Sequence, residues 1–386
     1  MAAEPGPAAV ANPAAAPPAP LAASVIVVAR DRAAQLAAAL ASLRAQRLTA
    51  GRFEIIAVDD GSRDETWPSL CAQAARPSDA ALPPLQIVRN DRSLGPGLAR
   101  NRGAARARGA VLVFLDSDCR ALAGWLEALL APLAEPAVGA VGGAEALDPE
   151  QGLLGRLFHF ALTSPLSTGR LRGGTGWRLG RYRPRGYSMA VRRELFVRLG
   201  GFAGLRHGED LELVGRIERA GYRCVHAPAA RVLHRRRQSL AGFARQLFAM
   251  GRARSTLLRR DRTHAEPVYF VPALLLLGVL ALGLAGALVP GAREAVVGWA
   301  LVPAGLYGAL LGLAAVRALG RPAAAVLAPL VVAVQQLCYG AGLFWGLVAP
   351  WREEQPFGPR APLPRCSRGL PASGPAPARE RHPPLP

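Results

Sequence analysis

The chain has 386 residues, 51% of them hydrophobic, and a formal net charge of +20 that comes entirely from arginine, because the sequence contains no lysine. Because lysine is missing while alanine, glycine and proline are abundant, we attribute this charge to a general bias in amino-acid composition. No aromatic residues alternate with the arginines, as they do in many proteins that bind single strands, so we exclude nucleic acid as a partner. The five cysteines are scattered without a CxxC spacing, which excludes a disulfide framework and a structural zinc site and fits a reducing compartment.

Residues 1–22 are almost wholly alanine, proline and glycine, and this composition predicts a disordered leader. Residues 24–29, 53–58, 85–88 and 111–115 are short apolar runs, which are typical of strands buried on both faces. Segments with helical spacing of apolar residues separate these runs. Strands and helices that alternate at short intervals predict an α/β fold with a mostly parallel, Rossmann-like sheet and flanking helices.

Acidic residues follow two of these predicted strands directly. Asp59 and Asp60 come after the second run, and Asp116 and Asp118 come after the fourth, with one serine between them. Ligands of open α/β sheets bind beyond the carboxyl ends of the strands, so the four carboxylates should lie close together. Mg²⁺ and Mn²⁺ need oxygen ligands and commonly bridge carboxylates to substrate phosphates. The pattern favours a cation and phosphate site, and the alternative is an ordinary acidic turn.

Several motifs stand in a fixed order along the chain. In the first half they are residues 24–32, Val-Asp-Asp-Gly-Ser at 58–62, Gly-Leu-Ala-Arg-Asn-Arg-Gly at 97–103 and Phe-Leu-Asp-Ser-Asp at 114–118. In the second half they are Gly-Tyr-Ser-Met-Ala-Val-Arg-Arg-Glu-Leu-Phe at 186–196, Leu-Gly-Gly-Phe at 199–202 and Gly-Glu-Asp-Leu-Glu-Leu at 208–213. Together these motifs resemble those of family 2 glycosyltransferases, which are inverting enzymes with the GT-A fold.

The resemblance implies a site for a nucleotide-sugar donor and a divalent metal, Mg²⁺ or Mn²⁺. An inverting displacement needs a base opposite the leaving nucleotide, and Asp210 would be that base, with Glu209 positioning it or the acceptor. The implied metal ligands are Asp116, Asp118 and His234. The donor would be bound by Ala29, Arg30, Asp59, Asp60, Arg100 and Asp116. The alternatives are an acidic first helical turn at residues 209 and 210 and a surface histidine in a basic run at residue 234.

The second half of the chain is arranged for a membrane. Residues 235–265 mix apolar residues with many arginines, which predicts basic amphipathic helices at the bilayer interface. Three nearly uncharged stretches between residues 266 and 350 are each long enough to cross a bilayer. The arginines place the catalytic domain on the cytoplasmic side. Three crossings would place the tail, residues 351–386, which we predict to be disordered, on the outer side of the membrane together with its arginines. Either the first two segments form a re-entrant pair, or the tail is an exception to the rule that arginines stay on the cytoplasmic side.

We therefore expect a GT-A catalytic domain over residues 23–234, with an all-α membrane region after it. The expected protein is a multi-pass glycosyltransferase of the cell (inner) membrane that moves a sugar to a hydroxyl of a lipid-linked or envelope-glycan acceptor. The glycine- and arginine-rich residues 170–185 are either a mobile loop over the site or an exposed linker. One alternative is a non-catalytic membrane protein that binds nucleotide-sugars or anionic lipid. Another is a nucleotidyl-transfer enzyme, but the first strand is not followed by the glycine-rich loop that such enzymes use.

Overall fold

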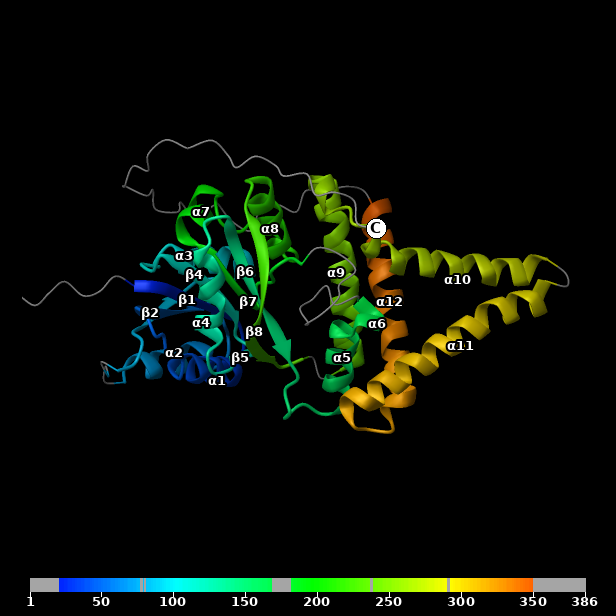
Figure 1. Ribbon diagram of the computed structural model, residues 1–386, viewed down its shortest axis with the longest axis horizontal. Coiled ribbons are helices and arrows are strands. Elements are labelled where there is room, and N and C mark those ends of the chain that lie inside the picture. The colour runs from blue at the N-terminus through cyan, green and yellow to red at the C-terminus, as the bar shows by residue number, and fades with distance from the viewer. Residues whose placement is uncertain are drawn as a thin grey trace, which may run out of the picture.

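A computed structural model describes residues 21–76, 79, 81–168, 182–236, 239–289 and 292–349. The predicted tail, the leader as far as residue 20 and residues 170–181 of the predicted loop lie outside the described residues. Within the described part, a sheet with flanking helices forms one end of the molecule and a group of long helices forms the other (Figure 1). The predicted α/β fold followed by an all-α region is confirmed.

The sheet has eight strands in the order β3-β2-β1-β4-β7-β6-β8-β5. The four predicted strands are parallel neighbours: β1 (Leu21–Ala29), β2 (Arg52–Asp59), β3 (Leu85–Arg89) and β4 (Val111–Asp116). Four further strands extend the sheet: β5 (Cys119–Ala121), β6 (Val138–Ala146), β7 (Ser188–Arg192) and β8 (Arg223–His234). Strand β7 is antiparallel to both β4 and β6, whereas β6 and β8 are parallel, so the sheet is mixed.

Helices cover both faces of the sheet, which is why its central strands read as continuous apolar runs. Along β1, Val25 and Val27 pack in one hydrophobic cluster, and Ile26 packs in the cluster on the other face. The helices of this domain are α1 (Ala33–Arg44), α2 (Thr66–Ala74), α3 (Pro96–Ala104), α4 (Trp125–Leu130), α7 (Arg193–Arg198) and α8 (Glu209–Arg219). A trio of phenylalanine rings, Phe114, Phe196 and Phe202, fixes the α7 side against β4.

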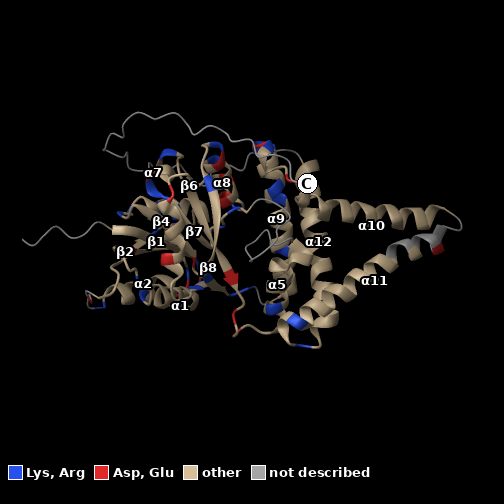
Figure 2. Ribbon diagram, in the orientation of Figure 1, with Lys and Arg blue, Asp and Glu red and all other residues tan. Residues whose placement is uncertain are grey.

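The helical half contains α5 (Leu153–Thr163), the short α6 (Pro165–Thr168), α9 (Leu240–Arg260), α10 (Val271–Leu288), α11 (Ala292–Leu319) and α12 (Ala324–Val348). Helices α10, α11 and α12 are each long and apolar enough to cross a membrane. Figure 1 shows α9 and α12 side by side between the sheet domain and a hairpin of α10 and α11 that points away from it. Charged residues gather on the sheet domain and on α9 and are nearly absent from the hairpin (Figure 2).

Candidate active site

The two carboxylates after β4 lie beside the predicted histidine. The short strand β5 pairs with the end of β8, and this pairing sets Cys119 opposite His234. As a result, His234 Nε2 lies 3.4 Å from Asp118 Oδ1. The other oxygen of Asp118 accepts a hydrogen bond from Arg32 Nη1 at 3.0 Å. The structure therefore brings together two residues that are more than a hundred positions apart in the sequence.

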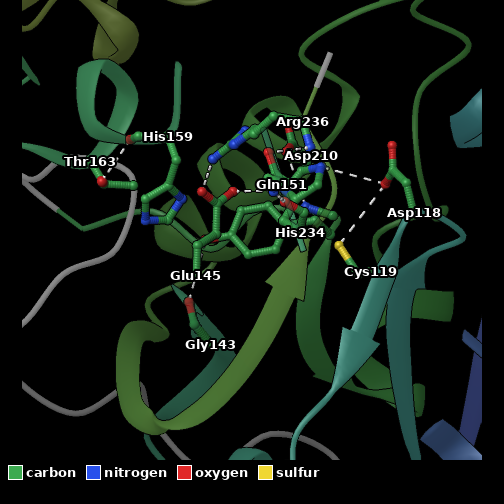
Figure 3. A network of polar contacts seen from close by, with 12 residues as sticks. Asp118, Cys119, Gly143, Glu145, Gln151, His159, Thr163, Asp210, His234 and Arg236 are labelled. Atoms are coloured by element: carbon green, nitrogen blue, oxygen red, sulfur yellow. Dashed lines mark hydrogen bonds and ion pairs between the residues drawn. The ribbon is translucent and has the colours of Figure 1, made fainter. Parts of the chain in front are cut away.

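The second nitrogen of His234 faces a buried carboxylate. His234 Nδ1 lies 3.0 Å from Oε1 of Glu145, whose side chain has no exposed surface. The other oxygen of Glu145 pairs with Arg236, and Figure 3 shows the histidine between Glu145 and Asp118. An ionised carboxylate only accepts hydrogen bonds, so Nδ1 must be the donor. Glu145 thereby directs Nε2 toward Asp118, as carboxylates do for metal-binding histidines.

The donor set at this edge fits a hard divalent cation. One atom each from Asp118, Cys119 and His234 lie within 4.8 Å of one another. Burial raises the pKa of the Cys119 thiol to about 11, so it is not a thiolate at neutral pH. Burial lowers the pKa of His234, and the adjacent Asp118 carboxylate opposes this shift by raising it. A divalent cation would be held by an Asp118 oxygen and by the imidazole Nε2 in its unprotonated form.

Arg100 connects the two acidic motifs of the site. It is almost completely buried on α3 and donates from Nη2 to Asp116 Oδ1 at 2.6 Å and from Nη1 to Glu209 Oε1 at 2.7 Å. The two carboxylates raise the pKa of the Arg100 guanidinium above its usual value although burial opposes them. Both terminal nitrogens are thus paired within the protein. We predicted that Arg100 binds the donor, and the structure adds an ion-pair bridge that the sequence did not indicate.

The acidic pair at residues 209 and 210 begins helix α8. Gly208 precedes it with φ +82°, a left-handed conformation that favours glycine, and turns the chain so that both carboxyl groups stand at the helix start. Asp210 Oδ2 accepts a hydrogen bond from the Gly186 N–H at 3.1 Å, and Oδ1 accepts one from the Leu211 N–H at 2.8 Å. Burial and the adjacent Asp210 raise the pKa of Glu209 to about 7, although the ion pair with Arg100 opposes this shift.

Asp60 organises the loop before α3. It accepts hydrogen bonds from the side chains of Asn90 and Ser93 and from the backbone N–H groups of Leu94 and Gly95, all within 3.0 Å. Asp60 is also a lining residue of the cavity. These hydrogen bonds hold residues 93–95, which lead into α3, in place at the site.

The remaining predicted donor residues are divided between the cavity and the sheet interior. Arg30 lines the cavity, and about half of its side chain is exposed. Asp59 is fully buried, accepts from the Ser62 N–H at 3.1 Å and lies 3.4 Å from Arg89. Ala29 is buried, and its carbonyl accepts from the Asp60 N–H. Asp59 and Ala29 are not among the residues that line the cavity, so they support the site from behind.

One cavity of about 2150 Å³ connects these groups. Asp116, Asp118, His234, Glu209 and Asp210 all line it. It continues past α9 to the apolar side chains of α10 and ends against Tyr307 of α11. Of the six acidic residues assigned to the site, all except Asp59 therefore line a single cleft.

Sequence reasoning missed two residues of this site. Arg32, which pairs with Asp118, cannot be distinguished by its sequence position from the many other arginines of the chain. Glu145 was not identified from the sequence, although it is the only charged residue in strand β6 (Val138–Ala146). A single carboxylate in a fully buried strand indicates that a positively charged or hydrogen-bonding partner lies next to it, because burying a charge without such a partner has a large cost in free energy.

Comparisons with known proteins find glycosyltransferases that are similar to this chain. The model of glycosyl transferase family 2 matches residues 24–207. Pre-mycofactocin glycosyltransferase of Mycobacterium tuberculosis is 30% identical over 244 residues, which are 62% of this chain and 48% of that protein. Glycosyltransferase AglE of Haloferax volcanii is 32% identical over 120 residues, which are 31% of this chain and 38% of that protein. The chain thus spans less than half the length of these two relatives.

A solved structure with a similar fold is the mannosyltransferase PcManGT from Pyrobaculum calidifontis, in complex with GDP-Man and Mn²⁺. It superimposes with a TM-score of 0.56 at 22% identity, over 82% of this chain and 89% of that one. At this identity the likeness concerns the fold. Residues 24–207 of this chain therefore match the glycosyl transferase family 2 model on a GT-A-like fold, and this part is joined to three helices that are long and apolar enough to cross a membrane.

Proposed function

We propose that this protein is a membrane-anchored inverting glycosyltransferase that moves a sugar from a nucleotide-sugar to a hydroxyl of a lipid-linked or envelope-glycan acceptor. The observation that carries the proposal is the single cavity. Its polar end contains Asp118, His234 and Asp210, and its other end is lined by apolar residues of α10. A charged donor and an acceptor with an apolar part can therefore meet in one space.

At the polar end, Asp118 and His234 would hold a divalent cation, and Asp116 is the third candidate ligand. When bound, such a cation supplies Lewis-acid stabilisation of the charge that develops on the leaving diphosphate. Mn²⁺ in the PcManGT complex supports this assignment by analogy of fold. Arg30 and Arg32 line the same wall and can donate hydrogen bonds to phosphate oxygens.

Asp210 is the base in this proposal. In an inverting displacement, the acceptor hydroxyl oxygen forms a bond to the anomeric carbon while the bond from that carbon to the nucleotide diphosphate breaks. Asp210 takes the hydroxyl proton. The hydrogen bonds from Gly186 and Leu211 keep its carboxylate from rotating. Glu209, tied to Arg100, keeps the start of α8 in register with Asp116 on β4.

The apolar end of the cavity suits a lipid-linked acceptor. Leu274, Leu275 and Val279 of α10 line it and are exposed along the side of the helix. The arginines of α9 are attracted to anionic headgroups, which supports a position of the catalytic domain at the cytoplasmic face of the inner membrane. An acceptor whose lipid stays in the bilayer can then present its hydroxyl to Asp210.

Turnover of nucleotide-sugars by the purified protein tests the proposal. With Mn²⁺ and a lipid extract as acceptor source, the protein should release nucleoside diphosphate, and Asp210→Asn should reduce this at least about 100-fold while nucleotide binding stays unchanged. Asp79→Asn, at an exposed turn, is the matched control and should keep full activity. Equal turnover in Asp210→Asn would overturn the assigned base. Metal-dependent nucleotide binding without any product would instead indicate the non-catalytic binding protein.

A further inference from the structure

Helices α9 and α12 pack along each other in parallel over most of their length. The contacting pairs Gly251 with Tyr339, Phe248 with Gly342, and Ser255 with Gly346 all differ by about ninety positions, so the two helices run in the same direction. At each pair, a Cβ on the glycine would overlap backbone or side-chain atoms of the other helix. Such close approach needs glycine, and it fixes α12 at the same level as α9.

Both ends of α12 are also tied to this layer. At its C-terminal end, Arg259 Nη2 of α9 donates to the carbonyl of Leu347 at 2.7 Å and to that of Ala349 at 3.1 Å. Toward its N-terminal end, Val331 and Val332 share a hydrophobic cluster with residues of α5 and α9. In the same cluster, Phe158 of α5 stacks on Phe243 of α9 with ring centroids 4.2 Å apart. Helices α5, α9 and α12 therefore form one packed layer.

This layer cannot enter the hydrocarbon region without its arginines. Four arginines of α9 are exposed, namely Arg245, Arg252, Arg259 and Arg260. An arginine is strongly disfavoured at the centre of a membrane helix. Because α12 lies beside α9 along its length, a bilayer that enclosed α12 would also enclose these charges. The apolar composition of α12 would by itself allow a membrane crossing, but the exposed arginines of the adjacent α9 disfavour it.

Within the described residues, the hairpin of α10 and α11 joins this layer only at its base, where Leu311, Ala315 and Leu319 of α11 belong to the same hydrophobic cluster, and it has the opposite character beyond the base. It points away from the layer (Figure 1), and Ala273 is the one described residue of α10 that is buried. At about 1.5 Å per residue, 18 residues of α10 extend about 27 Å, close to the thickness of a bilayer core of about 30 Å, and 28 residues of α11 extend about 42 Å, enough to cross that core with tilt. The hairpin tip holds Arg293 next to Glu294, whereas Arg317 and Arg321 stand at its base.

We propose that α10 and α11 alone cross the bilayer, that α12 lies with α9 in the interface, and that the C-terminal tail is on the same side as the catalytic domain. This inference rests on the membrane anchoring proposed above and not on the chemistry. It also resolves the conflict over the tail, because residues 351–386 contain six arginines and three glutamates. With two crossings these arginines stay on the cytoplasmic side, as the distribution of positive charge around membrane helices requires.

Native cysteines make the test possible in the full-length chain. Cys71 is exposed on the catalytic domain, Cys366 belongs to the tail, and a Val289→Cys variant adds a thiol at the exposed C-terminal end of α10, which is the tip of the hairpin. Spheroplasts would be treated with a membrane-impermeant maleimide before and after permeabilisation, and labelled peptides quantified by mass spectrometry. We expect the tip thiol to react in intact spheroplasts, and Cys71 and Cys366 to react only after permeabilisation.

Each other outcome has a separate meaning. Reaction of Cys366 together with the tip thiol in intact spheroplasts, with Cys71 protected, would overturn the two-crossing arrangement and favour three. Reaction of Cys71 in intact spheroplasts would contradict the cytoplasmic catalytic domain, and recovery of the protein in the soluble fraction would contradict the membrane anchoring itself. Should the tip substitution prevent folding, the unsubstituted chain still compares Cys366 with Cys71, because unequal protection of these two thiols refutes the proposal.

Discussion

Replacing Glu145 by glutamine should weaken metal binding without touching a metal ligand. The substitution keeps the shape of the side chain but removes the charge that accepts the Nδ1 proton of His234 and pairs with buried Arg236. The imidazole then becomes a poorer ligand, and its orientation is held less firmly. Residues that orient a metal-binding histidine in this way contribute about 10- to 100-fold in metal affinity, or about 1.4–2.8 kcal/mol.

The assay is a titration of purified protein with Mn²⁺ alone, in which the electron paramagnetic resonance signal of the free ion reports binding. Glu150→Gln is the matched control, because the Glu150 side chain is 73% exposed and pairs only with Arg120 among the ion pairs of the described residues. Thermal unfolding of each variant separates lost folding from lost binding. A folded Glu145→Gln protein with unchanged Mn²⁺ affinity would refute the positioning role of Glu145.

Three further predictions concern other parts of the molecule. Arg100→Lys should lower turnover about 10- to 100-fold with little change in acceptor KM, because an ammonium cannot bridge two carboxylates in the same geometry, and steady-state kinetics that match the unsubstituted enzyme would contradict this. Gly342→Ala should lower the free energy of unfolding by about 1–3 kcal/mol, because the added Cβ would overlap Phe248. Gly283→Ala is the control: it has open space around it and should raise the free energy of unfolding by up to about 1 kcal/mol. Denaturant unfolding in detergent measures both variants, and equal effects would contradict the close packing of α9 and α12. Burial and neighbouring arginines lower the pKa of His264 to about 4 in the folded protein, so the unfolded chain binds a proton at this residue more readily. The free energy of unfolding should therefore fall by up to about 3 kcal/mol as the pH drops from 6.5 to 4. A melting temperature that does not change with pH in this range would contradict this prediction.

The predicted half of the sheet follows from local patterns. Strands β1 to β4 are apolar on both faces because helices cover both faces, so each could be recognised from its own residues. The carboxylates after β2 and β4 follow from the rule that parallel strands end at one edge. By contrast, β6 is rich in glycine and β8 in polar residues, and neither carries a clear alternating pattern. Their places were decided by pairing with strands far away in the chain.

For the site, residue types could be predicted but partners could not. The motifs identified Asp118, Asp210 and His234 as candidates before any coordinates were known. That Arg100 would bridge two acidic motifs depends on α3 and α8 packing on the same face of the sheet, which no local pattern encodes. The role of Glu145 likewise depends on β6 lying next to β8, so that residues 89 positions apart meet.

The sequence by itself determined which residues could do chemistry and which segments could enter a membrane, because both properties belong to the composition of short stretches. Only the tertiary structure decided that the carboxylates share one cavity with the apolar side of α10. It also decided the place of α12, whose own residues are apolar enough for a crossing. The physical reason is that the cost of a position in the bilayer belongs to everything packed beside a helix, and the neighbour of α12 carries exposed arginines.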